Sequence, residues 1–223
     1  MKRIGIDVGG TNTDAVLVDG GTVVGAVKTA TTDDVTGGVR TALRDLSAQV
    51  GEAIAGAAAV MIGTTHFVNA VVQRRSLNRA AALRICLPAC ASLPPMVDWP
   101  RDLAELVDGG GYMVEGGHEY DGRPLMPLDE RAVAEAGRRM RADGVMSAAV
   151  TSVFSPLTSA FEDRAAEILR SEHPDLRVTC SSTLGRIGLL ERENVTILNA
   201  ALQDLYQYGN RNNWTIGVDK LAR

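Results

Sequence analysis

Aromatic residues are scarce in this sequence. Phe, Trp and Tyr together make up 4% of its 223 residues, whereas hydrophobic residues as a whole make up 45%. The core is therefore expected to consist mainly of Ala, Val, Leu and Ile side chains. The share of charged residues, 22%, is typical of a soluble globular protein, and the length suffices for one substantial domain or two small ones.

Cysteine is also rare, with Cys86, Cys90 and Cys180 as its three occurrences. An odd and sparse set excludes the disulfide framework of a small secreted protein. Cys86 and Cys90 are four positions apart without the further ligands that a structural zinc site needs, so we do not expect zinc. We expect reduced thiols in a cytoplasmic protein.

The sequence has no excess of positive charge and no long apolar run. Its net charge of −4 provides no basic field for nucleic acid. The basic residues Arg138, Arg139 and Arg141 fit a solvated helix face. The apolar start ends at Asp7, which is too short for a signal peptide, and no segment reaches the length of a membrane span. We expect no binding of nucleic acid or membrane.

The order of apolar patterns predicts an α/β fold. Apolar segments at 4–8, 15–18 and 23–28 predict three antiparallel strands in a meander, with a turn at Asp19–Gly21. Thr32 or Asp33 is expected to cap the helix that follows. We expect helices at about 35–46, 64–73, 128–142, 159–171 and 189–205, and strands at 58–62, 80–87, 145–153 and 176–180. Right-handed crossovers would place these later strands parallel to the first strand in a single sheet.

Two segments interrupt this alternation. Residues 88–127 contain most of the prolines and the run Gly109–Gly111, so we expect an irregular insertion with short strands around Tyr112–Val114. The tail at 206–223 is polar and loop-like at first and shows no packing pattern after that, as in a frayed end or a truncation scar. We therefore predict one domain over residues 1–205 and leave the tail out of fold reasoning.

The segment Asp7–Asp14 has the composition of a phosphate-binding turn between two strands. Glycines allow a positive φ and a close approach to a ligand, and successive backbone N–H groups form an anion-binding nest. A strand follows the turn, which excludes both a Walker loop and a Rossmann fingerprint. The alternative is an ordinary hairpin with two glycines at its tip. The expected phosphate ligands are Gly9, Gly10, Thr11, Asn12 and Thr13, and Asp7 is placed to hold Mg²⁺, with Asp14 anchoring the turn or sharing the metal.

This segment resembles the first phosphate loop of the superfamily that contains actin, sugar kinases and the Hsp70 chaperones. More narrowly, four separated motifs across residues 3–205 resemble the N-terminal part of the hydantoinase A / oxoprolinase family. The motifs are Ile4–Asp14, Gly63–Thr65 with Asn69–Ala70, Ser152–Pro156, and Gly185–Asn194 with Leu198–Ala200.

The resemblance implies an actin-like ATPase (ribonuclease H-like) fold, with a mixed sheet in which the meander precedes alternating helices and strands. Family members use ATP to hydrolyse cyclic amides such as hydantoins and 5-oxoproline, and relatives carboxylate ketones with ATP. The family mechanism phosphorylates the amide carbonyl oxygen and so opens the ring carbon to water. The implied cofactors are ATP and Mg²⁺, and the implied partners are a cyclic-amide substrate and the remainder of the enzyme or a second hydantoinase-type subunit.

The resemblance also assigns residues. Asp7 becomes the catalytic carboxylate associated with Mg²⁺. A strand end followed by a helix start at Gly63, Thr64 and Thr65 is expected to bind phosphate, although a simple helix cap would have the same pattern. His66 and Glu191 are catalytic candidates. Arg192 and Glu193 either bind substrate or complement the helix dipole.

One departure from the family pattern is the missing second phosphate turn, which the other half of an actin-like ATPase supplies. We therefore expect a fragment that is inactive alone. The alternatives are a small-molecule kinase of the same superfamily and a catalytically silent partner-binding domain. The exposed sheet edge of a truncated domain also makes a homo-oligomer plausible.

Overall fold

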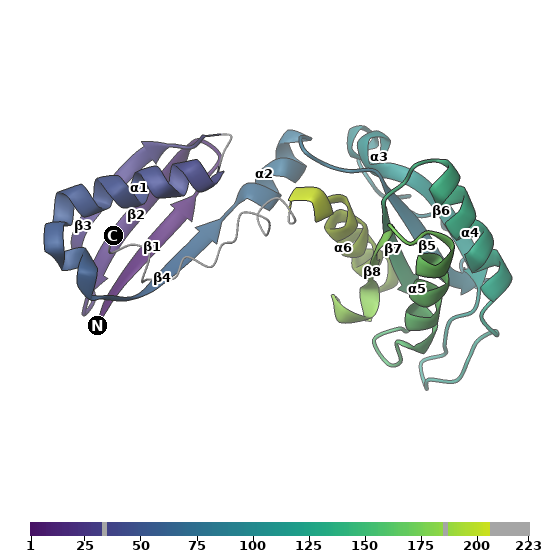
Figure 1. The fold of residues 1–223 in the computed structure, drawn as a ribbon. Coiled ribbons are helices and arrows are strands. Elements are labelled where there is room, and N and C mark those ends of the chain that lie inside the picture. The colour runs from purple at the N-terminus through teal and green to yellow at the C-terminus, as the bar shows by residue number, and fades with distance from the viewer. Residues whose placement is uncertain (33–34, 185–186, 206–223) are drawn as a thin grey trace. The chain divides into compact units, whose positions relative to one another are not determined.

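The computed structural model describes residues 1–32, 35–184 and 187–205, and the chain divides into two compact units (Figure 1). In this described part, the first unit comprises residues 1–75 and the second residues 76–205. The sequence predicts one domain over residues 1–205, whereas each unit has a sheet and a hydrophobic core of its own. The predicted tail at 206–223 lies outside the described residues.

The first unit is built on a four-stranded mixed sheet. β1 pairs antiparallel with β2 and parallel with β4, and β2 pairs antiparallel with β3, so the predicted meander is confirmed. The predicted cap Asp33 lies outside the described residues. In chain order, the elements are β1 (Lys2–Val8), β2 (Asn12–Asp19), β3 (Thr22–Ala30), α1 (Val35–Val50), a 3-10 turn (Gly51–Gly56), β4 (Ala57–Thr64) and α2 (His66–Gln73), and the strand order is β3-β2-β1-β4.

The core of this unit lies between α1 and one face of the sheet (Figure 1). Because side chains alternate along a strand, Ile4 and Ile6 of β1 point toward α1, where they pack with Leu43 and Leu46. The residues of β1 that alternate with Ile4 and Ile6 point to the opposite face of the sheet. That face is open to solvent around Met61, which is 61% exposed.

The second unit is built on a four-stranded parallel sheet with the strand order β6-β5-β7-β8. Its strands are β5 (Ala80–Leu87), β6 (Asp108–Glu115), β7 (Ser147–Ser152) and β8 (Arg177–Cys180). Its helices are α3 (Arg101–Val107), α4 (Glu130–Ala142), α5 (Ala160–Glu172) and α6 (Leu189–Ala201), with a 3-10 turn at Ser181–Thr183 before α6.

Helices cover both faces of this second sheet (Figure 1). α4 and α5 contribute Met140 and Leu169 to the cluster that packs on Leu83. Arg84, the next residue of β5, points to the opposite face and bonds Glu193 of α6. A parallel strand covered on both faces has few polar positions, and the run Ala80–Cys86 is buried throughout.

One expectation about the sheet is wrong. The later strands do not join the first strand in a single sheet, because among the described strands β5 to β8 pair with one another and β4 alone joins the meander. In the segment 88–127, the expected strand around Tyr112–Val114 is present as the eight-residue β6, and the helix α3 precedes it. A Cβ atom on Gly109 would lie 2.7 Å from the Ala80 carbonyl carbon, so glycine permits close strand pairing here rather than a turn.

The remaining predicted helices and strands are confirmed, with ends that shift by a few residues. Asp129 caps α4 by accepting a hydrogen bond from the Ala132 N–H at 2.9 Å. β4 runs through Gly63 to Thr64, and α2 begins at His66 rather than at Thr64. Among the described helices, none combines the length and the apolar composition needed to cross a membrane.

Candidate functional site

The turn between β1 and β2 is closed by one backbone hydrogen bond, which the Gly9 N–H donates to the Asn12 carbonyl at 2.9 Å. A Cβ atom on Gly9 would lie 3.0 Å from that same oxygen, so the tight closure favours glycine. Thr11 is exposed, and its hydroxyl accepts a hydrogen bond from the Asn12 side-chain amide at 3.3 Å. The turn therefore presents backbone and side-chain polar groups to solvent, as a phosphate site requires.

Thr31, just after β3, holds this turn from the inside. Its hydroxyl donates to the Gly9 carbonyl at 2.9 Å and lies 3.1 Å from the Thr13 hydroxyl, and its N–H donates to the Thr11 carbonyl at 2.9 Å. Sequence reasoning missed Thr31, since the register that brings the end of β3 under the turn is a tertiary feature. Thr13 was predicted to bind phosphate, but its side chain is 0% exposed. Its hydroxyl therefore supports the turn and is not accessible to a phosphate.

The junction between β4 and α2 lies beside the end of β1. β1 and β4 pair in parallel, with Asp7 opposite Gly63 and Val8 opposite Thr64. The Thr65 N–H donates to the Val8 carbonyl at 3.2 Å. The sheet thus brings together two segments that the sequence singled out separately, at the carboxyl ends of two parallel strands, where ligands often bind.

Two residues of this junction are placed only by their backbone. Thr64 ends β4 and His66 begins α2, but their side chains lie outside the described part of the structure. The helix start adds N–H groups and the positive end of the helix dipole to the site.

Asp7 and Asp14 face each other across β1 and β2, on the side of the sheet opposite α1. Asp14 forms an ion pair with Lys28 at 3.2 Å. With Gly5, Met61 and Gly63 they border an open hollow of about 420 Å³. Among the described residues no group of three or more Asp, Glu, His or Cys side chains could hold a metal ion.

This donor set fits one kind of metal site. Mg²⁺ in phosphate-transfer sites is held by one or two carboxylates and completes its shell with water and substrate phosphates. Asp7, with Asp14 beside it, suits such a site, because the turn that would hold the phosphates begins two residues later. A metal cage built entirely from protein ligands is not supported by these two carboxylates.

Two charged residues at the start of α6, Arg192 and Glu193, are buried in contacts that neither of the two predicted alternatives, substrate binding or a helix-dipole role, included. Arg192 is 2% exposed and donates to the Ser152 carbonyl at 2.6 Å and to the Ser181 hydroxyl at 2.9 Å. Burial lowers the pKa of this guanidinium. Glu193 is 1% exposed and accepts two hydrogen bonds from Arg84, at 2.6 and 2.5 Å.

Both side chains are thus occupied by protein partners, and they fasten α6 to the sheet rather than face a substrate. Glu191, in contrast, is exposed at the helix start. Glu162 was missed by sequence reasoning, because its place in the first turn of α5 is typical of a solvated residue. Its buried carboxylate accepts hydrogen bonds from the Ser152 N–H at 2.8 Å, the Ser181 hydroxyl at 2.5 Å and the Ser182 N–H at 2.8 Å.

Comparison with known proteins identifies the family to which this fold belongs. Residues 3–173 match the model of the hydantoinase/oxoprolinase N-terminal region. The chain belongs to this family. It is 30% identical to the caprolactamase subunit alpha of Pseudomonas jessenii, over an alignment that covers 90% of this chain and 31% of that protein. The hydantoinase/oxoprolinase region thus spans about a third of the length of this relative.

Two solved structures share the fold of this hydantoinase/oxoprolinase region. The ATP-dependent caprolactamase of P. jessenii matches with a TM-score of 0.74 and 26% identity, over 98% of this chain and 34% of that one. A nucleotide-free acetone carboxylase matches with a TM-score of 0.76 and 23% identity, over 93% of this chain and 33% of that one. The predicted mixed α/β class is confirmed, and both matches are consistent with an actin-like ATPase type of fold.

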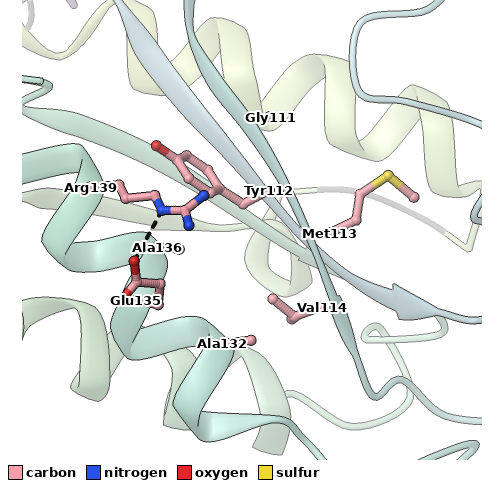
Figure 2. A pocket seen from close by; sticks show the side chains of 8 residues that line it. All are labelled: Gly111, Tyr112, Met113, Val114, Ala132, Glu135, Ala136 and Arg139. Carbon is pink, nitrogen blue, oxygen red and sulfur yellow. Dashed lines mark hydrogen bonds and ion pairs between the residues drawn. The ribbon is translucent and has the colours of Figure 1, made fainter.

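A groove of about 320 Å³ lies between β6 and α4 in the second unit of this hydantoinase/oxoprolinase region (Figure 2). Ala132 and Ala136 leave room there, and at its rim Arg139 donates to Glu135 at 3.1 Å. Burial raises the pKa of Tyr112, which lines the groove. None of the predicted site residues lies in it. The candidate site therefore remains the β1–β2 turn and its surroundings.

Proposed function

We propose that this chain supplies the ATP- and phosphate-binding part of an enzyme that hydrolyses cyclic amides at the expense of ATP. The observation that carries the proposal is the glycine turn at Gly9–Thr11, fixed from inside by Thr31 and set beside Asp7 and the β4–α2 junction. The membership in the hydantoinase/oxoprolinase family and the likeness to an ATP-dependent caprolactamase support it. The substrate class would be hydantoins, 5-oxoproline or related lactams.

The chemistry requires positioning more than a strong nucleophile. Transfer of the terminal phosphoryl group of ATP to the amide carbonyl oxygen leaves ADP and makes the ring carbon open to attack by water. The backbone N–H groups of Gly10 and Thr11, with the Asn12 amide, would hold the phosphate oxygens, and Gly9, whose N–H closes the turn, would allow their close approach. Mg²⁺ at Asp7 and Asp14 would neutralise the charge that these oxygens carry.

Other roles in the proposal follow from position. Thr64, at the end of β4, and Thr65, just before α2, would extend the phosphate site. His66, the first residue of α2, and Glu191, exposed at the start of α6, are the candidates for proton transfer. A cytoplasmic location belongs to the proposal, since the three cysteines are free thiols and the cosubstrate is ATP.

The complete activity would need more protein than this chain. It spans about a third of the length of its relatives, and one of them is named as a subunit. We propose that the remainder of such an enzyme, or a second hydantoinase-type subunit, completes the nucleotide site and supplies the site for the cyclic amide.

Calorimetry with Mg-ATP tests this function on the chain itself. We expect binding that is lost in Asp7→Ala and kept in Asp45→Ala, a control that removes a carboxylate from α1 on the covered side of the sheet. ADP release by a longer protein that contains this region, with hydantoin, 5-oxoproline and caprolactam as substrates, tests the reaction. Turnover stimulated by a sugar and by none of the cyclic amides would show a kinase and refute the proposal.

A further inference from the structure

Two side-chain amides of α2 lie against the glycine turn. Asn69 and Gln73 are four residues apart, so they share one face of the helix. A Cβ atom on Gly10 would lie 2.9 Å from the Asn69 Nδ2 atom and 3.6 Å from the Gln73 Nε2 atom. The α2 face that carries these amides therefore borders the turn at Gly10, the residue at its tip.

The amide of Asn69 is held in place by one hydrogen bond and keeps a second N–H group available. Its Nδ2 donates to the Thr65 hydroxyl at 3.2 Å, and that hydroxyl is 3.5 Å from the Val8 carbonyl oxygen, to which it donates. An amide nitrogen carries two N–H groups, and one of them serves this bond. Asn69 is half-buried, so its orientation is restricted while one edge stays accessible.

Gln73 has a different environment. It is exposed, and in the described part of the chain no hydrogen bond to its side-chain amide is found. Without such a hydrogen bond, the Gln73 amide does not stabilise the turn that it faces. A residue that meets a phosphate would gain a neutral hydrogen-bond donor at that position.

We propose that Asn69 and Gln73 form the second wall of the phosphate site, with their N–H groups donating to the terminal phosphate oxygens of ATP. This inference rests on the proposed function and adds residues to the same site. Neutral donors are suited to a phosphoryl group that has to leave, because they orient its oxygens without the strong hold of a full positive charge.

Near-isosteric substitutions test the donors. Asn69→Asp and Gln73→Glu keep the shape of each side chain and replace its N–H groups with anionic oxygen. We expect the affinity of the 223-residue chain for Mg-ATP, measured by calorimetry, to fall about tenfold or more for each variant. The affinity for AMP, which lacks the terminal phosphates, should change little. Val72→Thr is the matched control, since Val72 lies on the same helix and is 69% exposed.

A double-mutant cycle tests the contact with Gly10. The new methyl group in Gly10→Ala would displace the Asn69 amide, whereas Asn69→Ala leaves room for it. Gly10→Ala should therefore weaken Mg-ATP binding several-fold less in the Asn69→Ala background than in the wild-type chain. Equal effects in both backgrounds would overturn the inference.

The outcomes separate the two proposals. Absence of Mg-ATP binding both by the folded wild-type chain and by a longer protein that contains this region would refute the proposed function and this inference with it. Wild-type binding that Asn69→Asp and Gln73→Glu leave unchanged would refute the inference alone. Equal losses for ATP and AMP would assign the two amides a structural role and would also refute it. Gln73→Glu keeps the test decisive if Asn69→Asp fails to fold, because Gln73 is exposed.

Discussion

Replacing Thr31 with valine should loosen the glycine turn without changing the shape of the side chain. The Thr31 hydroxyl makes two hydrogen bonds, one to the Gly9 carbonyl and one with the Thr13 hydroxyl. Valine removes both hydrogen bonds, of which one involves the fully buried Thr13 and the other the partly buried Gly9. At about 1 kcal/mol for each lost bond, the turn should open about 2 kcal/mol more easily, which corresponds to roughly thirtyfold faster hydrogen exchange.

Hydrogen exchange followed by mass spectrometry, in peptides that cover residues 4–18, provides the local measurement. A global unfolding curve would be hard to interpret, since the chain has two units and need not unfold in one step. Mg-ATP affinity should fall in parallel, because a looser turn must be ordered again when phosphate binds. Thr31→Ser keeps the hydroxyl and should restore both properties.

The control is Thr22→Val, an exposed threonine at the start of β3, the strand that Thr31 follows. It should leave both exchange and binding unchanged. If Thr31→Val exchanges like the wild-type chain around the turn and binds Mg-ATP equally well, then Thr31 does not position the turn. Its hydrogen bonds to Gly9 and Thr13 would then contribute nothing to phosphate binding, and the reasoning from them would be refuted.

Two further predictions concern buried groups of the second unit. Glu193→Ala should destabilise this unit by about 3–5 kcal/mol in chemical denaturation, because it leaves the buried Arg84 without its carboxylate. The same change at exposed Glu105 should have little effect. Equal losses of stability in the two variants would contradict a structural role for the Arg84–Glu193 pair. Burial raises the pKa of the Cys86 thiol from near 9 to about 12, so Cys86 should resist iodoacetamide at pH 8 until the protein is unfolded. Since the folded state then holds this proton more tightly, stability should fall as the pH rises from about 9 to 12, and rapid native labelling of Cys86 would refute this reasoning.

The regular elements were predictable where their pattern is local. The meander and the turn at Gly9 and Gly10 lie within thirty residues, and each strand shows its own apolar alternation. The pairing of the later strands was not predictable, because an apolar run such as β5 shows that a strand is buried but not which strand lies next to it. The glycines at 109–111 suggested an irregular segment, because the close packing of Gly109 on β5 is a property of the assembled sheet.

The charged residues of α6 show the same limit for side chains. Glu191, Arg192 and Glu193 are indistinguishable in sequence, and a charged run at a helix start usually faces solvent. The partner of Glu193 is Arg84, 109 positions earlier, and the Arg192 guanidinium donates to Ser152, 40 positions earlier. Only the fold reveals that two of these three charges are structural.

The residues of the candidate site also differ in whether the sequence reveals them. The residues proposed to bind a phosphate through their backbone are visible in sequence, because such a site requires glycine and a flanking carboxylate locally. The residues that shape the turn from outside it are Thr31, just after β3, and Asn69 of α2. Thr31 carries no local signal of that task, and Asn69 belongs to a family motif that does not reveal it. Thr31 acts through a hydrogen bond of 2.9 Å to the Gly9 carbonyl, and Asn69 lies so near Gly10 that a Cβ atom there would be 2.9 Å from its amide nitrogen. A substitution of Thr31 or of Asn69 should therefore weaken nucleotide binding although it leaves the glycine motif intact. Such a result would show that the affinity depends on the shape of the turn and not on its glycines alone.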